Sequence, residues 1–237
     1  GYYAVGRPIG AAGDFITAPE LSSLFGRTLA RQLVEVMRAS TPHILELGAG
    51  SGKLALDMLT ELERLEQLPD SYSILEISAD LRQRQQTLLQ KHLPHIFERI
   101  HWLDTLPLQI SGAVIGNEVL DALPVHLLHW TDSRIMERGV ASKGSNFIWE
   151  ERLPEIPALL ELARQISVPD DYLSEISLPA RGLVGSLCER LVSGALVLID
   201  YGFGAREYYH PQRSSGTLMC HYRHHAHDDP FFLAGLQ

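Results

Sequence analysis

Short apolar runs alternate with helical stretches along the first half of the chain, and this alternation constrains the fold more than any other feature. The runs HILELG, SYSILEIS and GAVIGNEVL are strand-like, whereas residues 53–66 and the stretch ADLRQRQQTLLQKHL are helical. A later apolar run, GALVLIDYGFG, follows helical ARGLVGSLCERLV and adds another central strand. Strand alternating with helix predicts an α/β fold of the Rossmann-like type, a parallel sheet with helices on both faces.

The chain divides into four regions. Residues 1–40 hold a Gly- and Pro-rich loop and an amphipathic helix, opened by Thr17 or Pro19, with apolar residues at three- and four-residue steps. Residues 41–126 are the Rossmann-like ligand-binding core. Residues 127–179 contain the short strand-like pieces HLLHW, RIMERGV and NFIWEERL, which predict a small inserted subdomain. Residues 180–237 hold the later strand and a long C-terminal loop, and such loops are often functional.

Composition excludes several function classes. The formal net charge of −9, from 20 Lys and Arg against 29 Asp and Glu, disfavours nucleic acid as a partner. Only two cysteines occur and neither lies in a CxxC pair, which argues against a disulfide framework and fits a reducing compartment. No apolar run approaches the roughly 18 residues of a membrane helix. We therefore expect a cytoplasmic protein, or a mitochondrial matrix protein if eukaryotic, with no membrane insertion; a targeting peptide outside this chain remains compatible.

The histidine-rich stretch HYRHHAHDD resembles a set of metal ligands. Structural zinc takes its ligands at defined spacing from rigid elements, and this stretch lies in a loop with no second ligand group nearby in sequence. We expect a polar lid here and no metal site.

The turn in ELGAGSGK, after the first strand, is compatible with three ligands. A phosphate loop needs glycine at position 47 and a hydroxyl residue at position 54, and both positions hold leucine. A dinucleotide turn needs a third glycine where Lys53 stands, so a nicotinamide cofactor is the weaker choice. The remaining pattern has three alternating glycines, Gly48, Gly50 and Gly52. Its purely structural explanation is tight packing of the turn without a ligand.

Acidic residues near the strand ends favour a cationic cofactor. Glu46 lies two residues before the first glycine, where it would repel a pyrophosphate but attract the sulfonium and amino groups of S-adenosylmethionine. Glu76 follows the second strand, where it can accept both ribose hydroxyls, and Asp104 can accept from the adenine amino group. Each acid alone has an ordinary explanation, a surface glutamate for Glu76 and a helix cap or turn residue for Asp104. Together they mark the edge of the sheet where such folds bind ligands.

Four segments occur in the order GDFITAPELSSLFG, LELGAGSGKLALDML, NEVLDALPVH and LIDYGFG followed by GTL. With them the chain resembles the MidA-like family of class I S-adenosylmethionine-dependent methyltransferases, over nearly all of its length. The family includes a mitochondrial complex I assembly factor that methylates arginine. The resemblance implies a seven-stranded methyltransferase sheet and methylation of an arginine on a partner such as a respiratory complex I subunit. Family members continue past DDPFFLAGLQ into the last two strands, so we expect these strands to be missing here.

Acceptor chemistry is expected just after the strand GAVIGN. An arginine acceptor has a pKa above about 12, so it must be held in a plane and must lose a proton. Paired carboxylates can do both, and we predict Glu118 and Asp121 for these roles, with Asn117 facing the cofactor. The alternative is that Asn117 and Asp121 cap a helix beginning near residue 119. By resemblance, Thr17 lies nearest the cofactor in the loop GDFITAPE; its alternative role is a helix cap.

The predicted function is therefore arginine N-methylation of a protein substrate with S-adenosylmethionine. The alternatives are a binding or assembly module that keeps the cofactor pocket with little turnover, and a nicotinamide-dependent oxidoreductase. The sequence does not predict the oligomeric state, the substrate or the methylation multiplicity.

Overall fold

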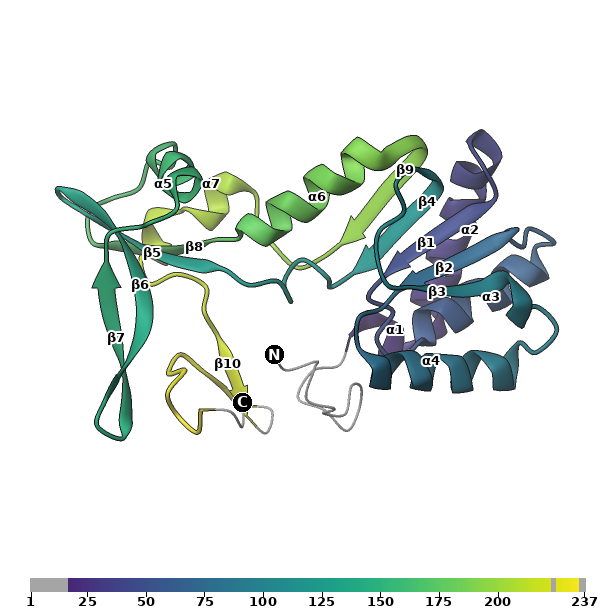
Figure 1. Cartoon of the computed structure of the whole chain (residues 1–237), viewed down its shortest axis with the longest axis horizontal. Helices are drawn as coiled ribbons and strands as arrows, with labels where there is room; N and C mark the ends of the chain where they lie inside the picture. Colours follow the sequence, from purple (N-terminus) through teal and green to yellow (C-terminus); the bar gives the residue numbers. More distant parts are fainter. Residues whose placement is uncertain (1–16, 223–224, 235–237) are drawn as a thin grey trace. The chain divides into compact units, whose positions relative to one another are not determined.

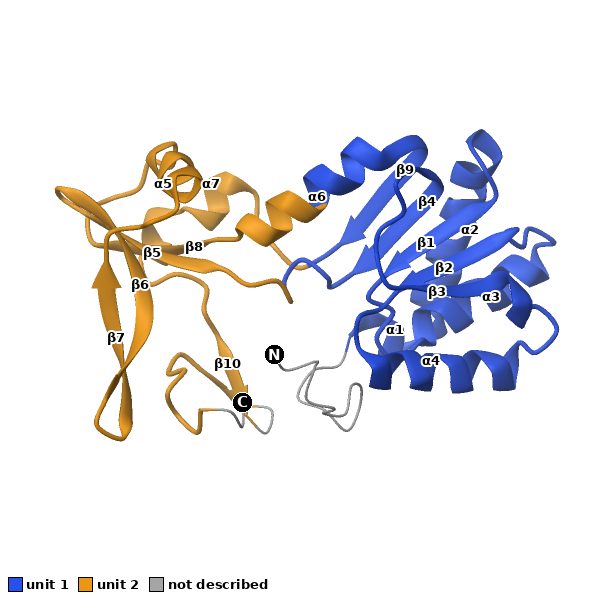
Figure 2. Ribbon diagram, in the orientation of Figure 1, with its two compact units in different colours: residues 1–121, 184–200 blue, residues 122–183, 201–237 orange. Residues whose placement is uncertain are grey.

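A computed structural model describes residues 17–222 and 225–234 of the chain. It divides into two compact units (Figure 2). Unit 1 comprises residues 1–121 and 184–200, and unit 2 comprises residues 122–183 and 201–237.

Unit 1 contains a parallel sheet of five strands in the order β3-β2-β1-β4-β9. The strands are β1 (His43–Leu47), β2 (Ser71–Leu75), β3 (Ile100–Leu103), β4 (Ile110–Asn117) and β9 (Leu191–Ile199). This arrangement confirms the α/β class predicted from the alternation of strands and helices. The carboxyl ends of all five strands meet at one edge, because neighbouring strands run parallel. The two further strands of a seven-stranded sheet are not among the described residues.

Helices cover the sheet of unit 1. Helices α2 (Ser23–Ala39), α3 (Lys53–Arg64) and α4 (Ala79–His92) contribute to one core with alternate residues of the strands. Residues 184–190 of α6 (Leu178–Arg190) belong to unit 1, and Figure 1 shows this part of the helix on the side of the sheet away from α4. The largest fully buried side chains of this core include Leu33, Ile44, Met58, Tyr72 and Ile115.

The predicted first helix is in fact two helices. A short helix α1 (Ala18–Leu21) ends at Ser22, whose backbone is extended, and α2 begins directly after it. The Ser22 hydroxyl accepts a hydrogen bond from the N–H of Leu24 (3.1 Å) and so caps α2. Thr17 occupies the N-cap position of α1 without a side-chain capping bond, so the prediction of one continuous helix is wrong.

Unit 2 contains an antiparallel sheet in the order β7-β6-β5-β8. Its strands are β5 (His126–Thr131), β6 (Arg134–Lys143), β7 (Asn146–Arg152) and β8 (Tyr172–Ile176), and α5 (Pro157–Arg164) packs against them. The three strand-like pieces of the middle region thus form antiparallel strands. The expected long loop after residue 204 contains short elements, α7 (Ala205–Tyr208), η3 (Pro211–Arg213), β10 (Cys220–Tyr222) and β11 (His225–His227).

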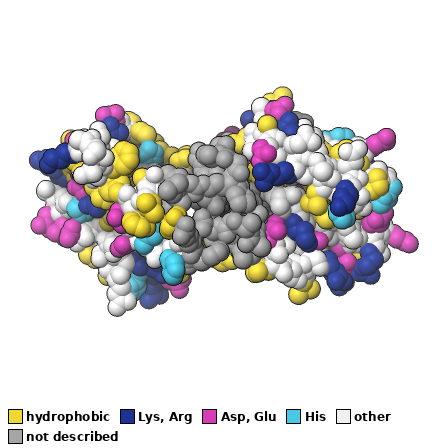
Figure 3. All heavy atoms as spheres, turned by 90° about the horizontal axis from the view of Figure 1, so that it is seen from below, with side chains coloured by type: hydrophobic (Ala, Val, Ile, Leu, Met, Phe, Trp, Pro, Cys, Tyr) yellow, Lys and Arg dark blue, Asp and Glu magenta, His cyan; other side chains and the backbone are white. Residues whose placement is uncertain are grey.

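Charged side chains of both signs are interspersed on the face drawn in Figure 3. Across residues 17–222 and 225–234, none of the helices combines the length and the apolar character that crossing a membrane requires.

Candidate cofactor and acceptor site

The glycine turn lies at the point where the strand order of the sheet reverses, because β1 pairs with β2 on one side and β4 on the other. Open α/β sheets bind ligands at this position. Gly48, Gly50 and Gly52 all have left-handed backbones, with φ of +60°, +55° and +84°. A side chain there costs roughly 1–2 kcal/mol per residue. A Cβ at Gly50 would meet no atom within 4 Å, so the turn presents bare backbone to open space.

A buried glutamine on α4 supports this turn. The side-chain nitrogen of Gln85 donates to the carbonyl of Gly50 (2.9 Å) and to the carboxylate of Glu76 (3.1 Å). Its oxygen accepts from the indole N–H of Trp102 (2.9 Å). Gln85 is not among the predicted site residues, although the sequence carries a signal for it: it occupies an apolar position between Leu81 and Leu89, at four-residue spacing.

Glu46 is buried beneath the turn, with 2% of its surface exposed. Its carboxyl accepts a hydrogen bond from the hydroxyl of Tyr72 (2.7 Å). Burial raises the pKa of Glu46 from its ordinary 4.5 to about 7; the bond from Tyr72 opposes this rise and the nearby charge of Glu76 adds to it. Glu46 therefore carries little charge below neutral pH and gains charge readily when a cation is near.

Glu76 and Asp104 follow the neighbouring strands β2 and β3. One oxygen of Glu76 accepts from the N–H of Ser78 (2.9 Å), and the other accepts from Gln85. The Asp104 side chain is 86% exposed and pairs with the guanidinium of Arg82 (2.8 Å). Arg82 also donates to the carbonyls of Glu76 (2.9 Å) and Leu103 (3.0 Å), so it links the ends of both strands.

Helix α1 is tied to the glycine turn and to the end of β4. The carboxylate of Glu20 accepts from the hydroxyl of Ser51, which lies in the turn. The backbone N–H of Ala18 donates to the carboxyl of Glu118. Thr17 directly precedes this helix and therefore lies at the same edge of the sheet. The rest of the preceding loop, residues 13–16, lies outside the described residues.

Glu118 begins the loop that follows β4. Its φ is +52°, an uncommon conformation for a non-glycine residue, and such outliers cluster at functional sites. Its N–H donates to the carbonyl of Ile199 (2.8 Å), and its carboxyl accepts from the Asn117 side chain (3.3 Å). Burial raises the pKa of Glu118; bonds from Asn117 and Ala18 oppose the rise, and the charges of Asp121 and Asp200 add to it.

No helix begins near Val119 among the described residues, so the interpretation of Asn117 and Asp121 as caps of such a helix is wrong. The loop lies beside the glycine turn, since a Cβ at Gly48 would be 3.6 Å from a methyl group of Val119. Asp121 is exposed and close enough to raise the pKa of Glu118. Asp200, after β9, was missed, although it shows the same signal as Glu76: an acid directly after an apolar strand.

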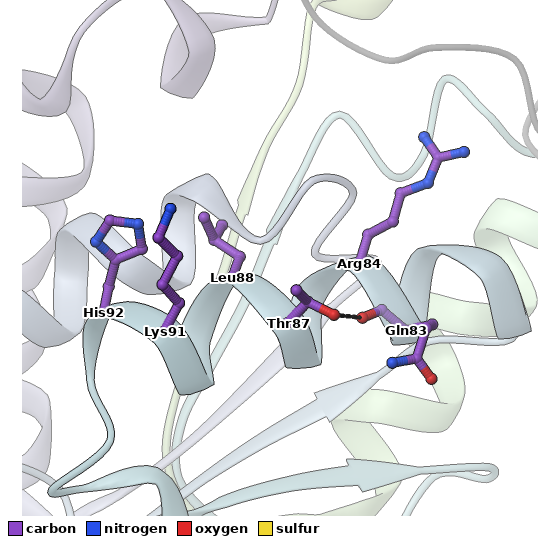
Figure 4. Close-up of a pocket in the computed structure, with 6 residues that line it drawn as sticks. All are labelled: Gln83, Arg84, Thr87, Leu88, Lys91 and His92. Carbon is purple, nitrogen blue, oxygen red and sulfur yellow. Dashed lines mark hydrogen bonds between the residues drawn. The ribbon is translucent and has the colours of Figure 1, made fainter.

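Two other features lie apart from this edge. A surface hollow of about 390 Å³ is lined only by side chains of α4 (Figure 4), namely Gln83, Arg84, Thr87, Leu88, Lys91 and His92. These side chains are largely exposed, whereas Gln85 faces the buried turn from the same helix. In the histidine-rich stretch, the described residues contain no group of three His, Cys, Asp or Glu side chains placed to hold a metal ion.

A parallel sheet with a bare glycine turn at its switch point and acids after neighbouring strands defines a class of protein, the Rossmann-like nucleoside-binding enzymes. The chain belongs to the family described as "Putative S-adenosyl-L-methionine-dependent methyltransferase", whose model matches residues 28–237. This membership confirms the predicted resemblance and makes S-adenosylmethionine the cofactor of the chain's family. The open turn and the buried Glu46 fit that cofactor.

Two curated relatives and one crystal structure that resemble the chain are consistent with membership in this family. The chain is 30% identical to the mitochondrial protein arginine methyltransferase NDUFAF7 homolog of Drosophila melanogaster, covering 96% of this chain and 57% of that one. The Danio rerio protein arginine methyltransferase NDUFAF7 is 27% identical, with 96% and 59% covered. A crystal structure from Burkholderia thailandensis, bound to S-adenosyl-homocysteine, is 43% identical with a TM-score of 0.88, covering 94% of this chain and 58% of that one. The chain thus spans less than two thirds of the length of these relatives.

Proposed function

We propose that the protein transfers a methyl group from S-adenosylmethionine to an arginine side chain of a partner protein. The observation that carries the proposal is that the turn after β1 and the loop after β4 lie side by side, at the point where the strand order of the sheet reverses. The bare turn from Gly48 to Gly52 lies directly beside the loop that bears Glu118. The names of the curated relatives, protein arginine methyltransferases, support arginine as the acceptor.

The cofactor roles follow from the positions of the side chains. Backbone at the three glycines approaches the ligand, and Glu76 accepts from the ribose hydroxyls. Glu46 faces the sulfonium and amino groups of S-adenosylmethionine. Its buried carboxyl has a raised pKa, and a nearby positive charge favours its ionised form. Asp104 accepts from the adenine amino group, Thr17 covers the cofactor, and Asn117 faces it at the end of β4. When bound, S-adenosylmethionine supplies an electrophilic methyl group on a sulfonium.

Glu118 and Asp121 handle the acceptor. One carboxylate holds the guanidinium in a plane, which aligns one of its terminal nitrogens with the methyl carbon. As the nitrogen–carbon bond forms, the carbon–sulfur bond breaks and its electron pair remains on sulfur. The proton lost by the guanidinium passes to the Glu118 carboxylate. A raised pKa suits this step, because a general base works best when its pKa lies nearer the working pH.

The test is transfer of tritiated methyl groups from S-adenosylmethionine into proteins of a cell lysate, followed by mass-spectrometric mapping of the labelled residue. Glu118→Gln should lower the initial rate by at least about 100-fold. Its affinity for S-adenosyl-homocysteine should stay within about threefold of the wild type by calorimetry. Glu98→Gln is the matched control, because Glu98 is exposed on a short 3-10 helix, η2 (Phe97–Arg99), outside the proposed site.

Three outcomes would change the assignment. Label on lysine or on a small molecule would replace the acceptor while keeping the cofactor. Tight binding of S-adenosyl-homocysteine without any transfer would favour the binding or assembly module. An unchanged rate in Glu118→Gln would remove Glu118 from the mechanism.

The partner we propose is a protein such as a respiratory complex I subunit. The compartment we propose is the cytoplasm, or the mitochondrial matrix in a eukaryote. Cys188 and Cys220 are both free thiols, which supports a reducing compartment. The curated relatives are named as mitochondrial, which supports the matrix for a eukaryotic protein.

A further inference from the structure

Asp200 lies directly after β9, beside the start of the Glu118 loop. Strands β4 and β9 are parallel neighbours, and Asn117 pairs with Ile199 at their carboxyl ends. Glu118 and Asp200 are therefore the first residues beyond two adjacent strands, and both belong to unit 1.

Asp200 and Ile199 together bind the backbone of this loop. One carboxylate oxygen of Asp200 accepts from the N–H of Leu120 (2.8 Å) and from the N–H of Asp121 (3.3 Å). The carbonyl of Ile199 accepts from the N–H of Glu118 (2.8 Å). The end of β9 thus satisfies three of the loop's backbone donors, in a segment that has no helix or strand of its own.

The loop needs such an anchor because Glu118 has a left-handed backbone, with φ of +52°. A non-glycine residue keeps this conformation only where its surroundings over-determine it. Hydrogen bonds to a carboxylate are stronger than bonds to a neutral acceptor, so Asp200 can hold the two donors after Glu118 firmly.

We propose that Asp200 is the positioning residue for Glu118: it anchors the 118–121 loop and so aims the Glu118 carboxylate at the acceptor. This inference rests on the proposed function, in which Glu118 takes the proton. Asp200 acts through Glu118 and not on the substrate.

The charge of Asp200 has a second effect, separable from the anchoring. An asparagine could also accept from two N–H groups, yet the residue is an acid. Its other carboxylate oxygen is buried without a hydrogen-bond partner among the described residues. The negative charge contributes to raising the pKa of Glu118, after burial and together with Asp121. Anchor and charge can therefore be tested with two substitutions at one position.

Asp200→Asn keeps an acceptor oxygen and removes the charge, whereas Asp200→Ala removes both. The matched control is Asp70→Ala, the loss of an exposed acid just before β2, at the opposite edge of the sheet. Three measurements are made on each variant: hydrogen exchange of the amides of Leu120 and Asp121, calorimetric affinity for S-adenosyl-homocysteine, and the pH dependence of tritiated methyl transfer into the lysate.

In Asp200→Ala, exchange at the two amides should accelerate at least tenfold, and methyl transfer should fall about 10- to 100-fold with cofactor affinity within about threefold. In Asp200→Asn, exchange should accelerate less than in Asp200→Ala, because the amide oxygen still accepts both bonds but more weakly, and the acid limb of the pH–rate profile should move to lower pH. Asp70→Ala should change neither the exchange of the two amides nor the rate and pH dependence of methyl transfer.

Unchanged exchange in Asp200→Ala, or equal acceleration in both variants, would overturn the anchoring role. If Asp200→Ala does not fold, Asp200→Asn decides by itself: exchange equal to that of the wild type together with an unshifted acid limb would overturn the proposal. If the wild type transfers no methyl group, the proposed function fails, and the exchange data still decide whether Asp200 anchors the loop.

Discussion

Replacing Glu46 by glutamine tests the electrostatics of the glycine turn most directly. The substitution keeps the size of the side chain and an oxygen that can accept from the Tyr72 hydroxyl, but it removes the ionisation. In the folded protein burial raises the pKa of Glu46 from 4.5 to about 7, whereas in the unfolded chain the carboxyl titrates near its ordinary value.

The sign and size of the effect follow from proton linkage. Because the folded state holds this proton more tightly, its contribution to stability is fully present below about pH 4.5 and is lost as the pH rises through about 7. One unit of pKa difference corresponds to about 1.4 kcal/mol, so the full loss is of order 3 kcal/mol. Glu46→Gln escapes this loss, since glutamine does not titrate.

The assay is urea unfolding, followed by far-ultraviolet circular dichroism, at several pH values from about 5 to about 8.5. The free energy of unfolding of Glu46→Gln, relative to the wild type, should rise by roughly 2–3 kcal/mol across this range, because a part of the full loss falls below pH 5. Glu98→Gln, which alters an exposed acid, should show no such rise. A difference that stays constant with pH would refute the reasoning, because it would mean that Glu46 ionises in the folded protein as it does in water.

The same carboxyl should make cofactor binding depend on pH. A sulfonium favours the charged form of Glu46, so the affinity for S-adenosylmethionine relative to neutral-sulfur S-adenosyl-homocysteine should rise between about pH 6 and about pH 8. In Glu46→Gln the ratio should be flat. A rising ratio in the variant would assign the effect to another group.

Two further substitutions probe the turn and unit 2. Gly50→Ala and Gly52→Ala both force a side chain into left-handed backbone, at roughly 1–2 kcal/mol each, but a Cβ at Gly52 also meets a buried glutamine of α4 at 3.3 Å. Gly52→Ala should therefore lower the melting temperature more, and equal shifts in calorimetry would contradict this. Glu175→Ala removes a buried carboxylate that accepts from the Thr217 N–H (2.7 Å), the Thr217 hydroxyl (3.0 Å) and the Tyr208 hydroxyl (2.9 Å). Leaving such donors unpaired costs about 1–3 kcal/mol each, so limited proteolysis within residues 201–222 should accelerate; an unaltered cleavage rate would argue against it.

Local signals were sufficient for the fold of unit 1. The alternation of strands and helices predicted the parallel sheet, because strands that are buried on both faces are continuous apolar runs in the sequence. The sharp turn at the three glycines could also be predicted locally, since the ability to adopt a left-handed backbone belongs to each glycine by itself. Glu76 and Asp104 could be placed at one edge of the sheet from their positions after strands alone.

Other features depended on contacts between residues distant in sequence. Ser22 breaks the expected first helix, and the periodicity of the flanking leucines conceals this break. The capping role of Asn117 and Asp121 was wrong because Glu118 and its loop bond to the end of β9, some 80 residues later. No local sequence pattern predicts a hydrogen bond between residues so far apart in the chain.

By itself, then, the sequence determined the fold class, the glycine turn and the acids near the strand ends, because each depends on residues close together in the chain. Only the tertiary structure decided that Gln85 supports the turn, that Glu46 is buried against Tyr72, and that Asp200 anchors the Glu118 loop. The physical reason is that burial and hydrogen bonding are set by neighbours in space. Those neighbours become known only when strands and helices from distant segments have packed together.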